Sequence, residues 1–245
     1  MKLFDPDPDL RWLFVMAHPD DELAIAAWMH RLRGFAADVR VLWMHSTPVR
    51  EAESRRAMDV LRVSANSLTF LDAPDGDLCD HLAEYLPRVE AHVARASPDR
   101  IVTTAFEQGH LDHDATNLLV NRSAGIIPVL EVPLYHGYFR EIMPLNRFAD
   151  PIGQEILELT REEQRLVKRV ARLYPSQTIW RNLVWSEVLS WIKLRPTHLL
   201  RTERMRLQTW RDYRRPHLPA NLARRVESSP RWARWLAAMD EFGTK

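Results

Sequence analysis

Residues 11–22 read R-W-L-F-V-M-A-H-P-D-D-E, a stretch in which an expected strand leads directly into an expected helix. Arg11–Ala17 is nearly all apolar after its first residue, as expected for a strand that is buried on both faces of a parallel sheet. Asp21–Arg33 has apolar residues at helical spacing, and Gly34 ends it. The connection between the two elements therefore lies at the carboxyl edge of a parallel sheet, where open α/β sheets bind ligands.

That connection contains one imidazole and two carboxylates, from His18, Asp20 and Asp21. These side chains are of the kinds that bind metal ions in proteins. A simpler interpretation exists, because Pro19 suits the first position of a helix and acidic residues suit its positive end. The stretch alone does not decide between a metal site and an ordinary helix start.

The composition is that of a globular protein with one large domain. The chain has 245 residues, of which 46% are hydrophobic, and a net charge of +1 that predicts no strong general attraction to nucleic acid. The charge is uneven, since residues 1–150 carry 15 Lys and Arg against 23 Asp and Glu, whereas residues 151–245 carry 19 against 10. We expect the two parts to pack on each other, with a basic appendage for an anionic partner as the alternative.

The cysteine content and the lengths of the apolar runs argue against a disulfide-bonded, a secreted or a membrane-spanning protein. The single cysteine, Cys79, excludes an intrachain disulfide and a multi-cysteine zinc site. The first ten residues contain no apolar signal core, and no run approaches the roughly 18 apolar residues that a membrane-spanning helix needs. We therefore expect a cytoplasmic protein.

Strands and helices alternate along the first part of the chain, which predicts an α/β fold. We expect further strands at Asp38–His45, Ser67–Leu71, Arg100–Ala105, Pro128–Val132 and Leu134–Phe139, and helices at Arg50–Val63, Asp77–Ala96 and Ala115–Ser123. This order predicts a Rossmann-like, mostly parallel sheet with helices on both faces. No G-x-G-x-x-G follows the first strand, so a dinucleotide-binding fingerprint is absent.

The second part of the chain is basic and reads as helical. After a connector at Arg140–Leu159, we expect helices at Arg161–Leu173, Ile179–Leu194 and Thr197–Arg211. We accordingly expect a catalytic core at 1–160 and a helical C-terminal extension at 161–245, packed on the same domain. Six tryptophans within 180–235 favour a helical cap with its aromatic side in the interface. A surface for single-stranded nucleic acid or for an anionic membrane is the alternative.

A second polar loop, Q-G-H-L-D-H-D at 108–114, follows the strand at Arg100–Ala105. Like the first loop it leaves a strand and enters a helix, so the two loops share one edge of the sheet. His18, Asp21 and His113 can then present two imidazoles and one carboxylate to one ion, with positions left open for water as in catalytic sites. These ligands suit Zn²⁺ and also Fe²⁺.

The strings A-H-P-D-D-E and H-x-D-H resemble the LmbE/PIG-L family of metal-dependent N-deacetylases. Further pieces agree in order, namely R-E-A-E at Arg50–Glu53, F-L with D-G at Phe70–Gly76, L-E-V-P at Leu130–Pro133 and Y-P-S-Q at Tyr174–Gln177. The resemblance spans about residues 11–177. Leu111 stands where the family usually has Pro, a departure that removes no catalytic group.

The resemblance implies a role for each residue of the two clusters. The zinc ligands would be His18, Asp21 and His113. Asp20 resembles the general base, which takes a proton from metal-activated water. His110 resembles the residue that stabilises the tetrahedral oxyanion, and Asp112 would pair with it, keep it charged and fix its orientation.

Two further residues resemble substrate-contacting positions of the family. Arg50 and Asp75 carry groups that can hydrogen-bond vicinal sugar hydroxyls. The alternatives are a helix-surface pair between Arg50 and Glu53 and a plain turn at Asp75-Gly76.

We therefore expect a zinc-dependent hydrolase that removes an N-acetyl group from an amino sugar or an amino-sugar conjugate. The alternatives are an amidase for a larger sugar-linked amide or a lipid-linked glycan, and a non-catalytic module that binds sugars or anions. The expected partner is the N-acetylated amino sugar, and no nucleic acid is expected. Membrane-surface contact would accompany a lipid-linked substrate, and a homo-oligomer stays open.

Overall fold

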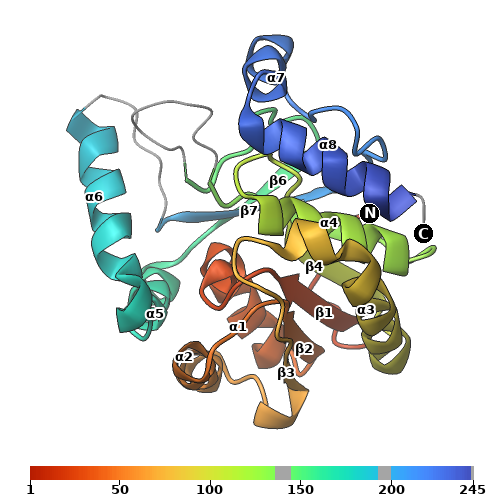
Figure 1. Ribbon diagram of the computed structural model, residues 1–245. Coiled ribbons are helices and arrows are strands. Elements are labelled where there is room, and N and C mark those ends of the chain that lie inside the picture. The colour runs from red at the N-terminus through yellow and green to blue at the C-terminus, as the bar shows by residue number, and fades with distance from the viewer. Residues whose placement is uncertain (136–144, 193–199, 244–245) are drawn as a thin grey trace.

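The computed structural model describes residues 1–135, 145–192 and 200–243. At its centre the strands form a sheet in the order β3-β2-β1-β4-β5-β7-β6 (Figure 1). The strands are β1 (Arg11–Met16), β2 (Asp38–Trp43), β3 (Leu68–Phe70), β4 (Arg100–Thr104), β5 (Val129–Val132), β6 (Gln154–Glu158) and β7 (Thr202–Leu207). The first five are parallel, and β7 is antiparallel to both β5 and β6. The expected mostly parallel α/β fold is confirmed.

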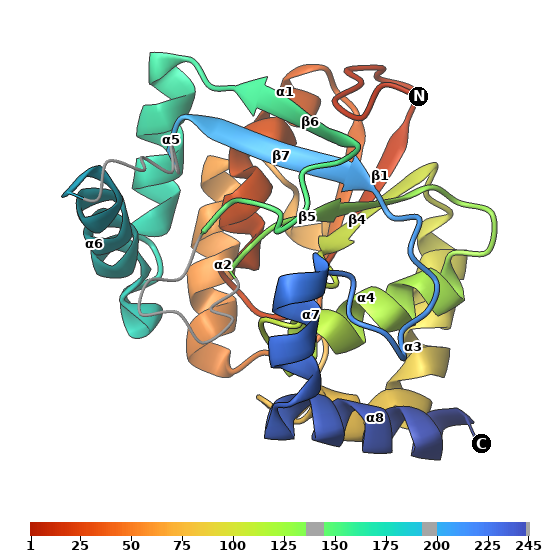
Figure 2. The same cartoon turned by 90° about the horizontal axis from the view of Figure 1, so that it is seen from above.

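Helices cover both faces of this sheet (Figures 1 and 2). They are α1 (Ala26–Gly34), α2 (Pro48–Val60), α3 (Leu82–Ala96), α4 (Leu111–Ser123), α5 (Arg161–Ala171), α6 (Ile179–Ile192), α7 (Ala220–Glu227) and α8 (Pro230–Gly243). Four short 3₁₀ helices join them, η1 (Asp21–Ile25), η2 (Ala65–Ser67), η3 (Leu78–His81) and η4 (Pro175–Gln177). Among the described helices, none is both long and apolar enough to span a membrane.

Strand β1 divides the core into two halves because its side chains alternate between the faces of the sheet. Trp12 and Phe14 pack in the half that contains α1, while Leu13 and Val15 pack in the half that contains α3, α4 and α8. The Trp12 ring meets the Trp28 ring of α1 edge to face, with centroids 5.8 Å apart. β1 is thus buried on both sides, which explains its apolar sequence.

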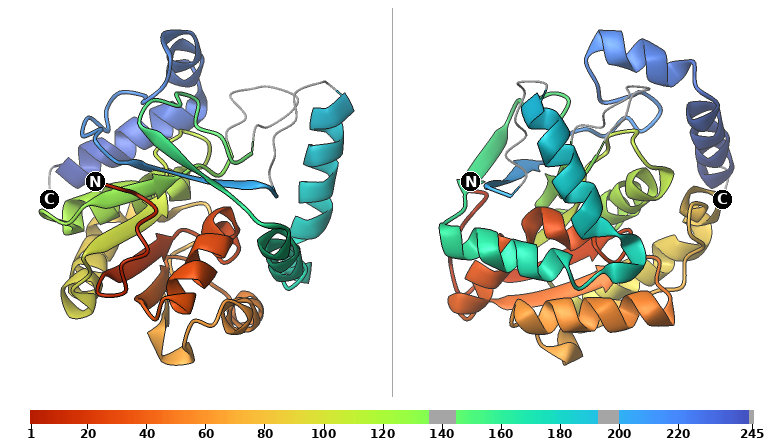
Figure 3. Two further views of the ribbon diagram at one scale, coloured as in Figure 1. Left: turned by 180° about the vertical axis from the view of Figure 1, so that it is seen from behind. Right: turned by 90° about the vertical axis from the view of Figure 1, so that its left-hand side faces the viewer.

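The strand order reverses next to β1, and this reversal positions the site. Phe14 of β1 lies in register with Val41 of β2 on one side and Val102 of β4 on the other. The chain passes from β1 to β2 and β3 in one direction, then crosses back to β4 and β5 (Figure 3). The loops after β1 and β4 therefore flank the switch point of the sheet, where α/β proteins form a ligand crevice.

Two of the sequence-based predictions for the second part of the chain were wrong. The connector at Arg140–Leu159 contains strand β6, and the helix expected at Thr197–Arg211 contains strand β7. β6 is a partly exposed edge strand with no fully buried residue, so it lacks an apolar pattern. The strand expected at Leu134–Phe139 falls largely outside the described residues, and Tyr135 forms an isolated bridge with Leu145.

Buried polar residues explain why β7 does not read as a strand. The Glu203 carboxylate accepts hydrogen bonds from the backbone N–H groups of Ala27 and Trp28, at 2.7 and 2.9 Å, and so caps α1. The Arg206 guanidinium lies 2.5 Å from the Glu131 carboxylate of β5, and both side chains are buried. Glu203 and Arg206 thus have partners from distant segments, and their burial hides the strand pattern in the sequence.

The tryptophan-rich segment has two kinds of environment. Trp232 and Trp235 of α8 are buried against the sheet domain, as a helical cap requires. Trp185 and Trp191 of α6 are 60% and 49% exposed. The cap interpretation therefore holds for α8 and not for the outer face of α6.

The Arg206–Glu131 pair provides a stability test. Arg206→Met should lower the free energy of unfolding by about 3–5 kcal/mol, because it leaves the Glu131 charge buried without its partner. Urea denaturation measures this loss. Glu131→Gln together with Arg206→Met should recover part of it.

Arg11→Met is the matched control, since it breaks a pair with Asp99 whose side chains are 46% and 35% exposed. It should cost far less. Equal losses in Arg206→Met and Arg11→Met would contradict the role given to the buried pair.

Candidate active site

The loop after β1 is held by its own carboxylates. The backbone N–H of His18 donates to Asp21 Oδ2 at 2.8 Å, and that of Asp20 donates to Glu22 Oε2 at 3.1 Å. Asp20 has φ = 106°, a left-handed conformation that residues with a Cβ rarely adopt. Backbone strain of this kind concentrates at functional sites, where the surroundings hold it in place.

Glu22 anchors this loop to the protein interior. Its buried carboxylate accepts hydrogen bonds from Trp43 Nε1 at 3.2 Å and from the Tyr174 hydroxyl, and burial raises its pKa. Two residues after Tyr174, the Ser176 hydroxyl donates to Glu53 at 2.6 Å. The Y-P-S-Q segment therefore binds both the first loop, through Glu22, and α2, through Glu53.

The imidazoles of His18, His110 and His113 converge, with ring centroids 4.9–5.5 Å apart. One nitrogen of each lies within 4.8 Å of the others. The Asp21 carboxylate lies between His113 and His18, with oxygens 3.4 Å from His113 Nε2 and 3.8 Å from His18 Nδ1. The folded chain thus brings together the three side chains that the sequence suggested as metal ligands.

The cluster fits a divalent cation. His113 Nε2 is buried, and its 3.4 Å contact with Asp21 does not have hydrogen-bond geometry, so this nitrogen has no hydrogen-bond partner within the part of the chain that the structure describes. His18 Nε2 lies 2.9 Å from Asp112 and 3.2 Å from Asp75. Burial opposes protonation of His18, but these two hydrogen bonds and the Asp21 charge raise its pKa to about 10. The cluster therefore favours positive charge, and its imidazole nitrogens and carboxylate oxygens suit zinc or ferrous iron.

Asp112 lies closer to His18 than to His110, the partner that the sequence suggested. The Asp112 carboxylate accepts from Gly76 N at 2.7 Å and from Leu78 N at 3.1 Å and bonds to His18, whereas His110 Nδ1 lies 4.0 Å away. Burial and the neighbouring imidazoles lower the pKa of His110 to about 4. The Asp112 charge acts to raise the pKa of His110 but does not offset these effects, because the turn after β3 draws the carboxylate toward His18.

Arg50 enters the site from the first turn of α2. It is 8% exposed, and its guanidinium donates to the Pro19 carbonyl at 3.1 Å. The same group lies 3.6 Å from Asp20 and 3.7 Å from Asp75. Burial and the Asp21 charge raise the pKa of Asp20, and Arg50 opposes this rise. The alternative of a helix-surface pair with Glu53 is thus excluded.

Sequence reasoning missed two arginines of α8 that hold the loops of the site. The Arg234 guanidinium bonds to the Gly76 carbonyl at 3.4 Å and to the carboxylates of Asp77 and Asp80. Arg231 donates to the Gly109 carbonyl at 2.5 Å, immediately before His110. Their only signal was the excess of basic residues after residue 150 and of acidic residues before it.

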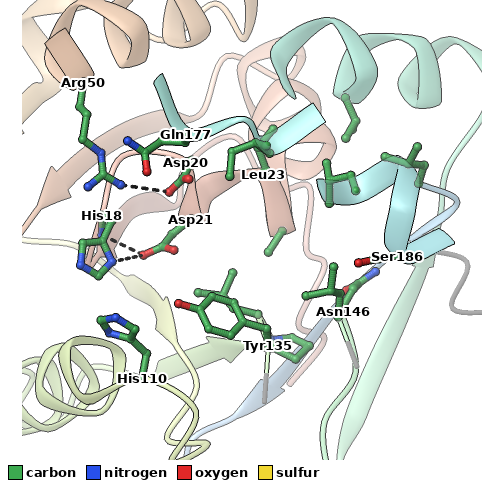
Figure 4. Close-up of a pocket in the computed structure, with 18 of the residues that line it drawn as sticks. His18, Asp20, Asp21, Leu23, Arg50, His110, Tyr135, Asn146, Gln177 and Ser186 are labelled. Atoms are coloured by element: carbon green, nitrogen blue, oxygen red, sulfur yellow. Dashed lines mark hydrogen bonds and ion pairs between the residues drawn. The ribbon is translucent and has the colours of Figure 1, made fainter. Parts of the chain in front are cut away.

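The histidines and carboxylates of the two loops, together with Arg50, form one end of a cavity of about 500 Å³ (Figure 4). Those that line it are His18, Asp20, Asp21, His110, Arg50 and Asp75. Asp112 and His113 are buried and are not among the lining residues. The cavity continues past this polar end along Tyr135 toward α6 (Figure 4).

Comparison with known proteins supports the resemblance. Residues 13–124 match the model of the PIG-L family, described as GlcNAc-PI de-N-acetylase, and the identification made from the motifs is confirmed over this segment. No curated protein gave a significant sequence match.

Several solved structures share the fold. A zinc-inhibited form of teicoplanin deacetylase Orf2 matches with a TM-score of 0.60 and 16% identity, over 80% of this chain and 97% of that one. N,N'-diacetylchitobiose deacetylase from Pyrococcus horikoshii matches with a TM-score of 0.59 and 14% identity, over 85% and 87%. A 4-carboxy-2-hydroxymuconate hydratase also matches, at 0.50 and 14%, over 82% and 98%. The fold thus serves more than one reaction, and the function has to be argued from the site.

Metal binding should stabilise the folded protein. At about a hundredfold excess of Zn²⁺ over its Kd, the melting temperature should rise by roughly 5–10 °C, because the ion binds only the folded cluster. His113→Ala should abolish the rise. His81→Ala removes an exposed histidine paired with Glu84 and should retain it. Equal melting curves for the wild type with zinc and with chelator would count against the site.

Arg234 should stabilise the turn that grips Asp112. In Arg234→Met, hydrogen exchange at the amides of Gly76 and Leu78 should accelerate about tenfold, since the turn loses charged contacts. Asp240→Asn is the matched control, because Asp240 lies on the same helix as Arg234 and its exposed pair with Arg214 does not involve the turn. Unchanged exchange in Arg234→Met would show that the turn is held without α8.

Proposed function

We propose that this chain, matched to the PIG-L family over residues 13–124, is a metal-dependent hydrolase of N-acylated amino sugars or their conjugates, with N-acetyl as the expected acyl group. The observation that supports this most directly is the convergence of His18, Asp21 and His113 beside the polar end of a cavity, at the switch point of the sheet. The deacetylases that share the fold make an acetylated sugar a reasonable first substrate.

His18, Asp21 and His113 would hold the metal, with zinc the first choice and ferrous iron the second. When bound, such an ion lowers the pKa of a coordinated water and polarises an acyl oxygen. The three side chains belong to loops that other groups fix on several sides, so the ligands are oriented before any ion arrives.

Asp20 would act as the general base. Its carboxylate lines the cavity next to the ligand Asp21, within reach of a water there. A base must be ionised, and the positive charge of Arg50, 3.6 Å away, favours the carboxylate against the effect of burial. After taking a proton from the attacking water, Asp20 returns it to the leaving amine. The water oxygen bonds to the acyl carbon, the amide C–N bond breaks, and a carboxylate and a protonated amine result.

His110 would stabilise the oxyanion as a neutral hydrogen-bond donor. Its Nδ1 accepts the backbone N–H of Asp112 at 3.2 Å, which leaves the proton on Nε2. The lowered pKa of His110 keeps the ring uncharged at neutral pH. A neutral donor of this kind stabilises developing negative charge without giving up its proton.

Arg50 and Asp75 would bind hydroxyl groups of the sugar. They lie 3.7 Å apart at the polar end of the cavity, and the Asp75 side chain is 58% exposed. A guanidinium and a carboxylate side by side can donate to one hydroxyl and accept from its neighbour. The sugar would therefore be held near the opening, with its amide directed toward the metal ligands.

The general base gives the decisive test. With N-acetylglucosamine and related acetylated amino sugars, Asp20→Asn should lower kcat by about 100- to 10,000-fold, because proton transfer is lost. Amine release measures kcat, and the zinc-induced rise in melting temperature shows whether the ion still binds. Metal is added at one equivalent, since a structural relative has a zinc-inhibited form.

Asp72→Asn is the control, because this carboxylate is 80% exposed and contacts Arg88 and Tyr85 outside the site. It should keep wild-type kcat. Full activity of Asp20→Asn would refute the proposed base. Zinc binding by the wild type without release from any N-acylated sugar would favour a non-catalytic binding module.

A further inference from the structure

Beyond the metal ligands the cavity changes character from polar to apolar. The polar end holds the reactive side chains, whereas the walls farther in come from Leu23, Ala24, Leu134, Leu145, Val167 and Leu183. Figure 4 shows Leu23 and Tyr135 between the reactive end and the far end of the cavity. The methyl group of an acetamide would leave most of this apolar space unused.

Helix α6 forms part of the apolar wall with one of its faces. Ile179, Leu183 and Ser186 line the cavity, and their spacing of four and three residues places them on one side of the helix. Val188 of the same helix is 43% exposed and is not among the lining residues. The apolar wall is thus built from a defined helix face.

The order of the groups along the cavity gives the substrate a direction. Arg50, His18 and Asp21 lie together at one end, and Asn146 and Ser186 lie at the opposite end (Figure 4). If the sugar binds Arg50 and Asp75, its amide carbon lies at the metal ligands. The acyl side of the amide then points away from Arg50, into the apolar part.

We infer that the enzyme prefers N-acyl groups longer than acetyl, with an unbranched aliphatic chain in the apolar part of the cavity. This inference rests on the proposed function, because it takes from it the place of the amide and of the sugar. Asn146 and Ser186 end the apolar part, so the preference should extend to chains of limited length. A cavity of about 500 Å³ is of the size that encloses a ligand larger than a monosaccharide acetamide.

The test is the rate of amine release from glucosamine bearing N-acetyl, N-butyryl or N-hexanoyl groups, with the zinc-loaded enzyme. Each methylene buried in the apolar part should raise kcat/KM about fourfold. The rate constant should therefore increase through the series. Free amine is measured in every case, so the acyl groups are compared by one readout.

Leu183→Gln tests the wall itself. A polar amide at this position should lower the ratio of kcat/KM for N-hexanoyl over N-acetyl substrate by about tenfold, since the chain then meets a hydrated group. Val188→Gln is the matched control, because it makes the same kind of change on the exposed side of α6. It should leave the ratio unchanged.

The outcomes separate the two proposals. Turnover of N-acetylglucosamine with no gain for longer chains, or an unchanged ratio in Leu183→Gln, would overturn the inference and leave the proposed function in place. No turnover of any member of the series would overturn the proposed function and the inference with it.

Discussion

The buried carboxylate of Asp112 joins the loops that follow three different strands. It accepts hydrogen bonds from the amides of Gly76 and Leu78 after β3, and it bonds to His18 after β1, while Asp112 itself begins α4 after β4. Asp112 is 1% exposed, so each bond that it loses leaves a polar group without water to replace the partner. The position of His18 and the path of the turn that follows Asp75 both depend on this one group.

The general plan of this site follows from the sequence. Apolar strands and helical segments alternate up to β5, and parallel strands place the loops after β1 and β4 at one edge. That sufficed to bring His18, Asp21 and His113 together. The hydrogen-bond partners of Asp112 could not be predicted from the sequence, because they depend on the path of the turn after β3. Two of them are the backbone amides of Gly76 and Leu78, and every residue type except proline has such an amide.

The second part of the chain was harder to predict because its polar residues lie inside. Periodicity assigns a polar residue to the surface, and this fails where the partner comes from far along the chain. Glu203 caps a helix that begins at Ala26, and Arg206 pairs with Glu131. Arg234 holds a turn about 150 residues earlier. Such pairs are properties of the folded chain and not of any local window.

The pairing of β6 with β7 has a consequence for how such enzymes diversify. The two strands are neighbours in the sheet, yet the chain between Glu158 and Thr202 leaves it to build α5 and α6. That excursion contributes Val167, Ile179 and Leu183 to the apolar wall, whereas the proposed metal ligands stand on loops of the parallel strands. Provided that Tyr174 keeps its bond to Glu22, evolution can lengthen, shorten or exchange the excursion without rebuilding the reactive centre. The residues that set the substrate range and the residues that carry out the chemistry then lie in separate segments of the chain and can change independently.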